Sequence, residues 1–127
     1  MDNTWKYVKP LKRADAVQNY LEENHIDLPQ KLIHIMETYN GGRPSVKRLV
    51  TSKGTEYAFK ALLSYNEGDK ETIYTIYPVL FKNTPLFPIG SDGAGNFVCY
   101  QMNTKTYVLW NHESNLEEHI IEMPFLI

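Results

Sequence analysis

The sequence is poor in cysteine, in long apolar runs and in excess charge, and each shortage excludes a class of protein. The single cysteine, Cys99, cannot form an internal disulfide or, by itself, a structural zinc site. The apolar runs fall far short of the roughly 20 residues of a membrane helix, and the first residues lack the apolar region of a signal peptide. The formal net charge of -2 argues against a dedicated nucleic-acid binder. These shortages favour a soluble protein of the reducing cytoplasm, with no direct nucleic-acid or membrane partner.

A chain of 127 residues with 43% hydrophobic composition is typical of one globular domain with a sizeable core. We therefore expect residues 1–127 to form a single domain. Its charge is unevenly distributed, because residues 1–60 carry a balance of +3 and residues 61–127 a balance of -5. Such asymmetry can reflect a charged partner, or it can vanish when the two halves interleave in the fold.

Apolar residues at helical spacing predict two helices in the first third of the chain. The first begins after Asp15, a suitable N-cap residue, and frays at 24–25. The second begins at the Leu-Pro pair of 28–29 and ends at the Asn-Gly-Gly string of 40–42. The faces expected to be buried consist of Ala16, Val17, Tyr20 and Leu21, and of Leu32, Ile35, Met36 and Tyr39.

The middle of the chain changes from helical to strand-like patterns. Residues 45–54 are predicted to form a basic, polar connection. Alternation of apolar and polar residues over 56–65 predicts a strand with one face in water. A turn is expected at 66–69, followed by a short helix over 72–82.

The last third contains the clearest strand signals. An apolar run at 86–89 leads into a turn at 90–96, and residues 97–102 and 106–110 flank a tight turn as an antiparallel hairpin. Helices followed by strands, without βαβ alternation, predict an α+β fold with a central antiparallel β-sheet flanked by helices.

No string in the sequence assembles a catalytic or metal site. The glycine-rich string at 90–96 lacks the Lys-Ser/Thr and the following helix of a phosphate loop, so a turn is expected there. A zinc-protease motif starting at His112 would need a second histidine where Leu116 stands, and His119 lies too far along the chain to share an ion. We expect no metal and no cofactor. A small hydrolase that uses Asp92 and His112 remains an alternative.

Several strings, in this order, resemble the SUKH superfamily, the Smi/Knr-like group. They are Leu28-Pro29, the 40–44 string Asn-Gly-Gly-Arg-Pro, the strand at 56–65, the 87–99 block from Phe-Pro-Ile-Gly to Cys, and the 108–113 block Val-Leu-Trp-Asn-His-Glu. The resemblance covers residues 15–119 and implies an α+β domain with a central sheet and flanking helices. It implies no catalytic residues. The Gly, Pro and Trp positions are expected to serve the fold, with Trp110 packed against the helices.

The end of the chain departs from the family pattern, which usually continues into a closing helix. Residues 123–127 are instead a short apolar segment. Two readings stay open: the chain is cut short before that helix, or the segment is a strand that covers the sheet.

The resemblance implies a function in protein binding. Bacterial members of the family are mostly immunity proteins that bind the toxic domain of a polymorphic toxin in the cytoplasm, often a nuclease. Fungal relatives act as regulatory interaction scaffolds. We expect a monomer or weak homodimer whose acidic residues face a cationic nuclease domain. The candidate partner-binding residues are Glu67, Asp69, Glu71, Asp92, Glu113, Glu117 and Glu118.

Overall fold

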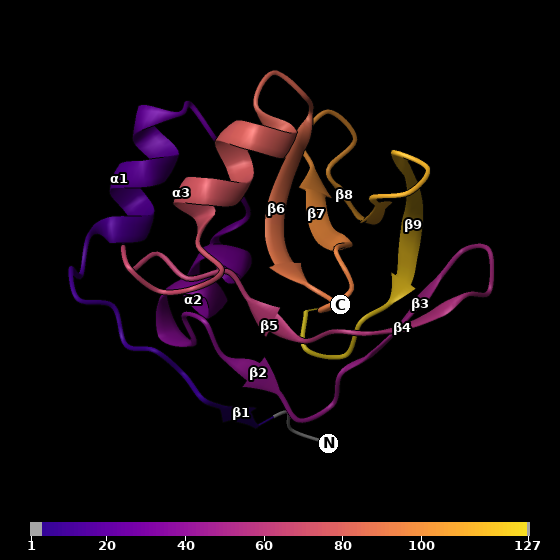
Figure 1. The fold of residues 1–127 in the computed structure, drawn as a ribbon, viewed down its shortest axis with the longest axis horizontal. Coiled ribbons are helices and arrows are strands. Elements are labelled where there is room, and N and C mark those ends of the chain that lie inside the picture. Colours follow the sequence, from indigo (N-terminus) through magenta and orange to yellow (C-terminus); the bar gives the residue numbers. More distant parts are fainter. Residues whose placement is uncertain (1–3, 127) are drawn as a thin grey trace.

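The computed structural model describes residues 4–126, with the helices gathered at one side of a strongly curved sheet (Figure 1). The helical elements are α1 (Ala16–Glu23), α2 (Gln30–Thr38), α3 (Ile73–Ile76) and the π-helix η1 (Tyr77–Phe81). The strands are β1 (Trp5–Lys6), β2 (Arg43–Pro44), β3 (Arg48–Thr51), β4 (Glu56–Ala58), β5 (Ala61–Leu62), β6 (Leu86–Ser91), β7 (Phe97–Gln101), β8 (Thr106–Asn111) and β9 (Leu116–Glu122). The predicted α+β class is confirmed.

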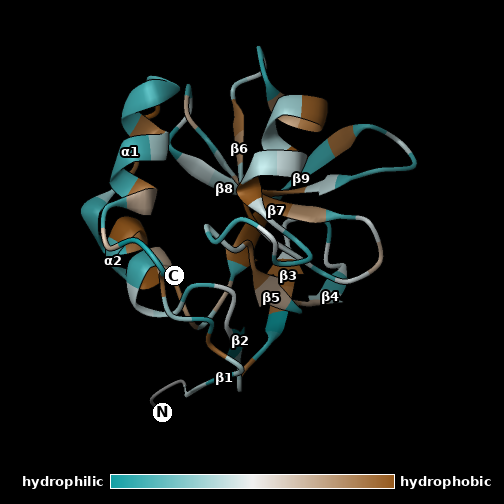
Figure 2. Ribbon diagram, turned by 60° about the vertical axis from the view of Figure 1, so that its left-hand side comes forward, coloured by the Kyte–Doolittle hydropathy of each residue, from teal (hydrophilic) through white to brown (hydrophobic). Residues whose placement is uncertain are grey.

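Helices α1 and α2 form where the apolar spacing predicts them. The four residues expected on the buried face of α1 are all buried. In α2, Leu32 and Met36 are buried together with Ile33, whereas Ile35 is only half-buried. Colouring by hydropathy shows the same division of both helices into polar and apolar residues (Figure 2). Asp15 occupies the N-cap position of α1 as predicted, although its carboxylate makes no capping hydrogen bond.

The main sheet has seven antiparallel strands in the order β4-β3-β9-β8-β7-β6-β5. Its edge strands, β4 and β5, are consecutive in the chain, so the sheet curls until its two edges meet. The amide of Phe59 donates to the carbonyl of Lys47, beside β3, at 2.7 Å. The amide of the next residue, Lys60, donates to the carbonyl of Ser91, on β6, at 2.8 Å. Phe59 is fully buried between the edges. A Cβ on Gly90 would lie 2.3 Å from the Phe59 ring, so the close approach requires glycine there.

The predicted polar connection at 45–54 is wrong, because β3 lies inside it. Leu49 and Thr51 on β3 are fully buried. The cationic residues of this stretch point outward, as a two-residue period allows, and they conceal the strand in the sequence. The Arg48 guanidinium binds the carboxylates of Glu56 on β4 and, at 2.9 Å, Glu122 on β9, so it links three adjacent strands.

The strand predicted over 56–65 is divided. Residues 56–58 pair with β3, whereas residues 61–62 pair with β6 at the opposite edge. The face predicted to lie in water does not extend to the end of this segment, because residues 62–66 are all buried. The amide of Tyr65 there donates to the side chain of Asn40 at 2.8 Å instead of to a neighbouring strand.

The helix predicted over 72–82 is confirmed as α3 followed by η1. Pro78, which has no N–H to donate, lies near the point where α3 passes directly into the π-helix η1. Phe81 of η1 is buried, and its ring contacts that of Trp110 with 5.1 Å between centroids. The expected packing of Trp110 against a helical element is therefore confirmed.

The C-terminal hairpin of β7 and β8 is confirmed, and a further strand, β9, follows it. Beyond β9 the chain forms a turn, with the amide of Leu126 donating to the carbonyl of Met123 at 3.0 Å. The prediction of a strand is therefore wrong for residues 123–126, and Ile127 lies outside the described residues. Phe125 packs inside the molecule, with its ring 4.6 Å from that of Phe59 and 5.6 Å from that of Trp5.

Candidate partner-binding site

The glycine-rich loop between β6 and β7 is held closed by its own side chains. The Asp92 carboxylate accepts hydrogen bonds from the amides of Ala94 at 2.8 Å and Asn96 at 3.1 Å, and from the Asn96 side chain at 2.8 Å. Gly93 and Gly95 have φ of 81° and 91°, which residues with a Cβ rarely adopt. The predicted turn is confirmed, and the aspartate is one of its structural parts.

His112 joins this loop to the β8–β9 connection. Its backbone amide donates to Asn96 Oδ1 at 3.1 Å, and its Nδ1 lies 2.8 Å from the same oxygen. His112 therefore contacts Asn96 and not the Asp92 carboxylate. The Ser91 hydroxyl is buried on β6. Ser91, His112 and Asp92 are therefore not joined in the serine–histidine–aspartate relay of a serine hydrolase.

Within residues 4–126, no group of three or more His, Cys, Asp or Glu residues is placed to hold a metal ion. Cys99 lies in the middle of β7 and is fully buried. Burial, followed by the charge of Glu117, raises the pKa of the Cys99 thiol well above its ordinary value. A nucleophilic cysteine needs the opposite shift.

The first acidic group, in the loop between β5 and α3, is partly used by the fold. Asp69 accepts a hydrogen bond from the Ser64 hydroxyl at 2.7 Å, and Glu71 pairs with the Lys60 ammonium at 2.6 Å. Burial raises the pKa of Glu71, but the hydrogen bond from Lys60 and the charges of Lys60 and Arg43 together hold it below its ordinary value. Only Glu67 of this group is exposed.

The second acidic group lies around the β8–β9 connection. Glu113 and Glu117 are exposed, with the Glu113 carboxylate 3.9 Å from the His112 ring. Glu118 is half-buried and accepts hydrogen bonds from Thr51 at 2.8 Å and from the Tyr57 hydroxyl at 3.3 Å. Burial and then the Glu118 charge raise the pKa of Tyr57.

The two acidic groups do not lie on neighbouring strands. Three strands, β8, β7 and β6, separate β9 from β5, which leads into the first acidic loop. Figure 1 shows that loop beside the helices and β9 on the far side of the sheet. Asp92 lies near the second group, since Asn96 binds both its carboxylate and His112, the neighbour of Glu113. The fully exposed members of the predicted set are Glu67, Glu113 and Glu117.

The sequence analysis missed a group of cationic side chains that the fold brings together. Lys9, Arg43, Lys60 and Lys70 line a cleft of about 320 Å³ between the N-terminal segment, β2 and the loop after β5. These residues are spread over half of the chain, so no local motif could reveal them. The signal that the sequence offered for this cleft was the excess of Lys and Arg over Asp and Glu in residues 1–60.

Comparison with known proteins agrees with this architecture. The chain matches the family SUKH_6, described as SMI1-KNR4 cell-wall, over residues 15–123. Neither the curated proteins nor the solved structures include a match. Between residues 4 and 126, no helix has the length and apolar character needed to cross a membrane. The matched segment runs from the start of α1 to the end of β9, so it contains all four helical elements and the whole seven-stranded sheet. The chain belongs to the SMI1-KNR4 family of the SUKH superfamily.

Proposed function

We propose that this chain is a cytoplasmic immunity protein that neutralises a cognate toxin by binding it in a stoichiometric complex. Domains of this family typically mediate protein–protein interactions. The observation that carries the proposal is the role in the fold of the polar residues in the two most distinctive sequence blocks, 87–99 and 108–113. Asp92 binds Asn96 and the loop backbone, and Asn96 in turn binds His112, so hydrogen bonds within the turn account for these side chains.

The partner proposed here is a cationic toxin domain, such as a nuclease. A nuclease has a basic groove for phosphates, and an inhibitor with suitably placed carboxylates can occupy that groove and gain association rate by electrostatic steering. Glu67, Glu113 and Glu117 are the strongest candidates, because they are exposed. Asp69, Glu71, Asp92 and Glu118 are weaker candidates, because their carboxylates already bind groups within the fold.

Co-expression with a graded dose of toxin tests the stoichiometric mechanism. Protection is expected to fail once toxin molecules outnumber copies of the chain. Protection that persists when the chain is far less abundant than the toxin, and that is lost in a folded Asp92→Ala/His112→Ala variant, would establish the hydrolase alternative instead.

Charge reversal tests the acidic surface separately. Glu113→Lys/Glu117→Lys should slow association with the toxin and weaken its dependence on salt. Glu22→Lys/Asp27→Lys is the matched control, because it makes the same charge change at exposed positions near the helices. Equal association rates for the two variants at low salt would contradict the proposed surface.

A regulatory interaction scaffold, like the fungal relatives, is the second candidate. Its support is the same family membership. Gene context distinguishes the two: a toxin gene immediately beside the gene for this chain favours immunity, whereas its absence favours the scaffold.

A further inference from the structure

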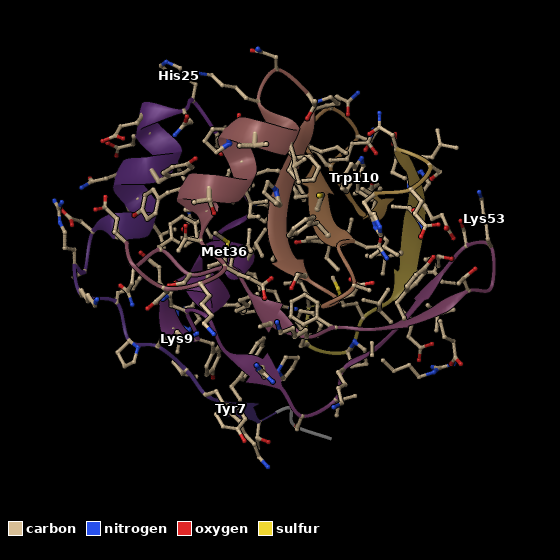
Figure 3. All side chains as sticks on the ribbon, in the orientation of Figure 1. Tyr7, Lys9, His25, Met36, Lys53 and Trp110 are labelled. Carbon is tan, nitrogen blue, oxygen red and sulfur yellow. The ribbon has the colours of Figure 1, made fainter. Side chains whose placement is uncertain are left out.

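The cationic cleft introduced above includes Glu71 of the first acidic group in its lining and no residue of the second acidic group. The N-terminal segment runs along one side, carrying Tyr7 and Lys9 (Figure 3). Arg43 of β2 and Lys60, next to β5, contribute further charge. The volume of about 320 Å³ is at the lower end of the range of about 300–1,000 Å³ that is usual for ligand sites.

Buried polar side chains hold the walls of this cleft in place. Asn40, fully buried after α2, donates to the carbonyl of Lys9 at 2.8 Å and accepts from the amide of Tyr65 at 2.8 Å. Asn66 donates to the carbonyl of Pro10 at 3.0 Å. The hydroxyl of Ser64, a cleft residue, accepts from Asn40 at 3.2 Å. The cleft is therefore preorganised, because the N-terminal segment, α2 and the loop after β5 are tied together beneath it.

Most of the positive charge in the cleft is not neutralised by the protein. Lys60 pairs with Glu71, the one acidic residue in the lining. The guanidinium of Arg43 lies over the Tyr7 ring at 5.4 Å, which holds it at the rim. Lys9 and Lys70 form no ion pair with any residue between 4 and 126, and the side chain of Lys9 extends across Gly41.

Asp69 also lies beside the cleft, since its carboxylate accepts a hydrogen bond from the hydroxyl of the lining residue Ser64. Counting it, four cationic groups still outnumber two carboxylates. Apolar surface is also present, since Leu62, Ala61 and the exposed ring of Tyr7 belong to the lining. Cationic groups around a partly apolar floor suit a ligand that combines carboxylates with a hydrophobic side chain.

We propose that this cleft binds an acidic segment of a protein partner, with a hydrophobic side chain of that segment on the floor and its carboxylates beside Lys9, Arg43 and Lys70. The inference rests on the proposed function in one respect, because it takes the ligand to be part of a protein. The lining of the cleft contains none of the exposed residues Glu67, Glu113 and Glu117, so these carboxylates stay available to the same partner.

A peptide titration followed by amide chemical shifts tests the proposal. The probe is the N-acetylated, C-amidated pentapeptide Glu-Glu-Phe-Glu-Glu, and the comparison ligands are its all-Gln counterpart, inorganic phosphate and a single-stranded RNA oligomer. Saturable shifts are expected at Gly41, Ala61 and Lys70 with the acidic peptide, and weaker binding is expected in high salt.

Charge-reversed variants locate the site. Lys9→Glu/Lys70→Glu is expected to weaken binding of the acidic peptide about tenfold, since exposed charge pairs contribute up to about 1 kcal/mol each. The matched control, Lys53→Glu/Lys82→Glu, makes the same charge change at exposed residues outside the cleft and is expected to bind as the unmodified chain does. Shift mapping on the unmodified chain gives an answer even if a variant does not fold.

Three outcomes would overturn the proposal. Shifts that avoid the cleft residues would place the binding elsewhere. Equal weakening by the two double variants would reduce the effect to overall charge. Tighter binding of phosphate or RNA than of the acidic peptide would make the cleft a phosphate site. Failure here, with toxin protection intact, refutes the cleft alone, whereas peptide binding without any toxin complex refutes the proposed function alone.

Discussion

Replacing Asn96 with alanine measures how much the loop at 92–96 contributes to the fold. Asn96 is 7% exposed, and its side chain makes three hydrogen bonds, one to Asp92 and two to His112. At about 1 kcal/mol for each bond, and somewhat more for the one to a carboxylate, Asn96→Ala should lower the free energy of unfolding by about 3 kcal/mol. Urea denaturation followed by circular dichroism measures this as a decrease in the midpoint of about 1–2 M.

Two controls make the result specific. Asn103→Ala removes the same side chain from an exposed turn and should change the free energy of unfolding by less than about 0.5 kcal/mol. A double-mutant cycle with His112→Ala should give a coupling of about 1 kcal/mol or more. A loss below about 1 kcal/mol for Asn96→Ala, or no coupling with His112, would refute the claim that these residues serve the fold.

Three further predictions concern other parts of the molecule. Phe59→Ala empties the place where the sheet edges meet, so it should cost about 3–5 kcal/mol of unfolding free energy in urea melts, whereas Val79→Ala at an exposed site should cost little. Because the pKa of Glu71 is lowered in the fold, its contribution is present above its ordinary pKa of 4.5 and is lost as the pH falls through the folded value. The stability difference between the unmodified chain and Glu71→Gln, below about 1 kcal/mol for this part-exposed pair, should therefore shrink between pH 6 and pH 3, and a constant difference would contradict the pairing. Cys99 should resist a thiol reagent in the native protein and react only on unfolding, and rapid native labelling would contradict its burial.

The elements that the sequence predicts well are those with local signals. The buried face of α1 and the hairpin of β7 and β8 follow from spacing and turn chemistry within about ten residues. The turn at 92–96 also follows from its own composition, because glycine and asparagine supply the dihedral angles that it needs.

The missed elements depend on residues that are distant in the chain. Strand β3 is hidden because Arg48 and its basic neighbours make a polar string, and only the partners Glu56 and Glu122 account for the charge. The division of β4 from β5 depends on the curl of the whole sheet, which no ten-residue window contains.

The candidate site also combines residues that the sequence indicates with residues that only the fold brings together. Composition drew attention to the acidic residues, but it could not show that Asp69 binds Ser64 while Glu67 stays exposed. The cationic cleft requires Lys9 and Lys70 to line the same cleft. Only the folded chain brings them together, because Asn40 and Asn66 bind the backbone of the N-terminal segment.

Calorimetric titration of the purified chain into the product of any toxin gene found beside its own, with residual toxin activity measured at each point, tests the central claim most directly. Binding by an immunity protein predicts that heat release and toxin activity both end at one equivalent of the chain, and that Asp92→Ala/His112→Ala, if folded, gives the same end point. Loss of toxin activity at a few hundredths of an equivalent, without a matching heat of binding, would contradict the account.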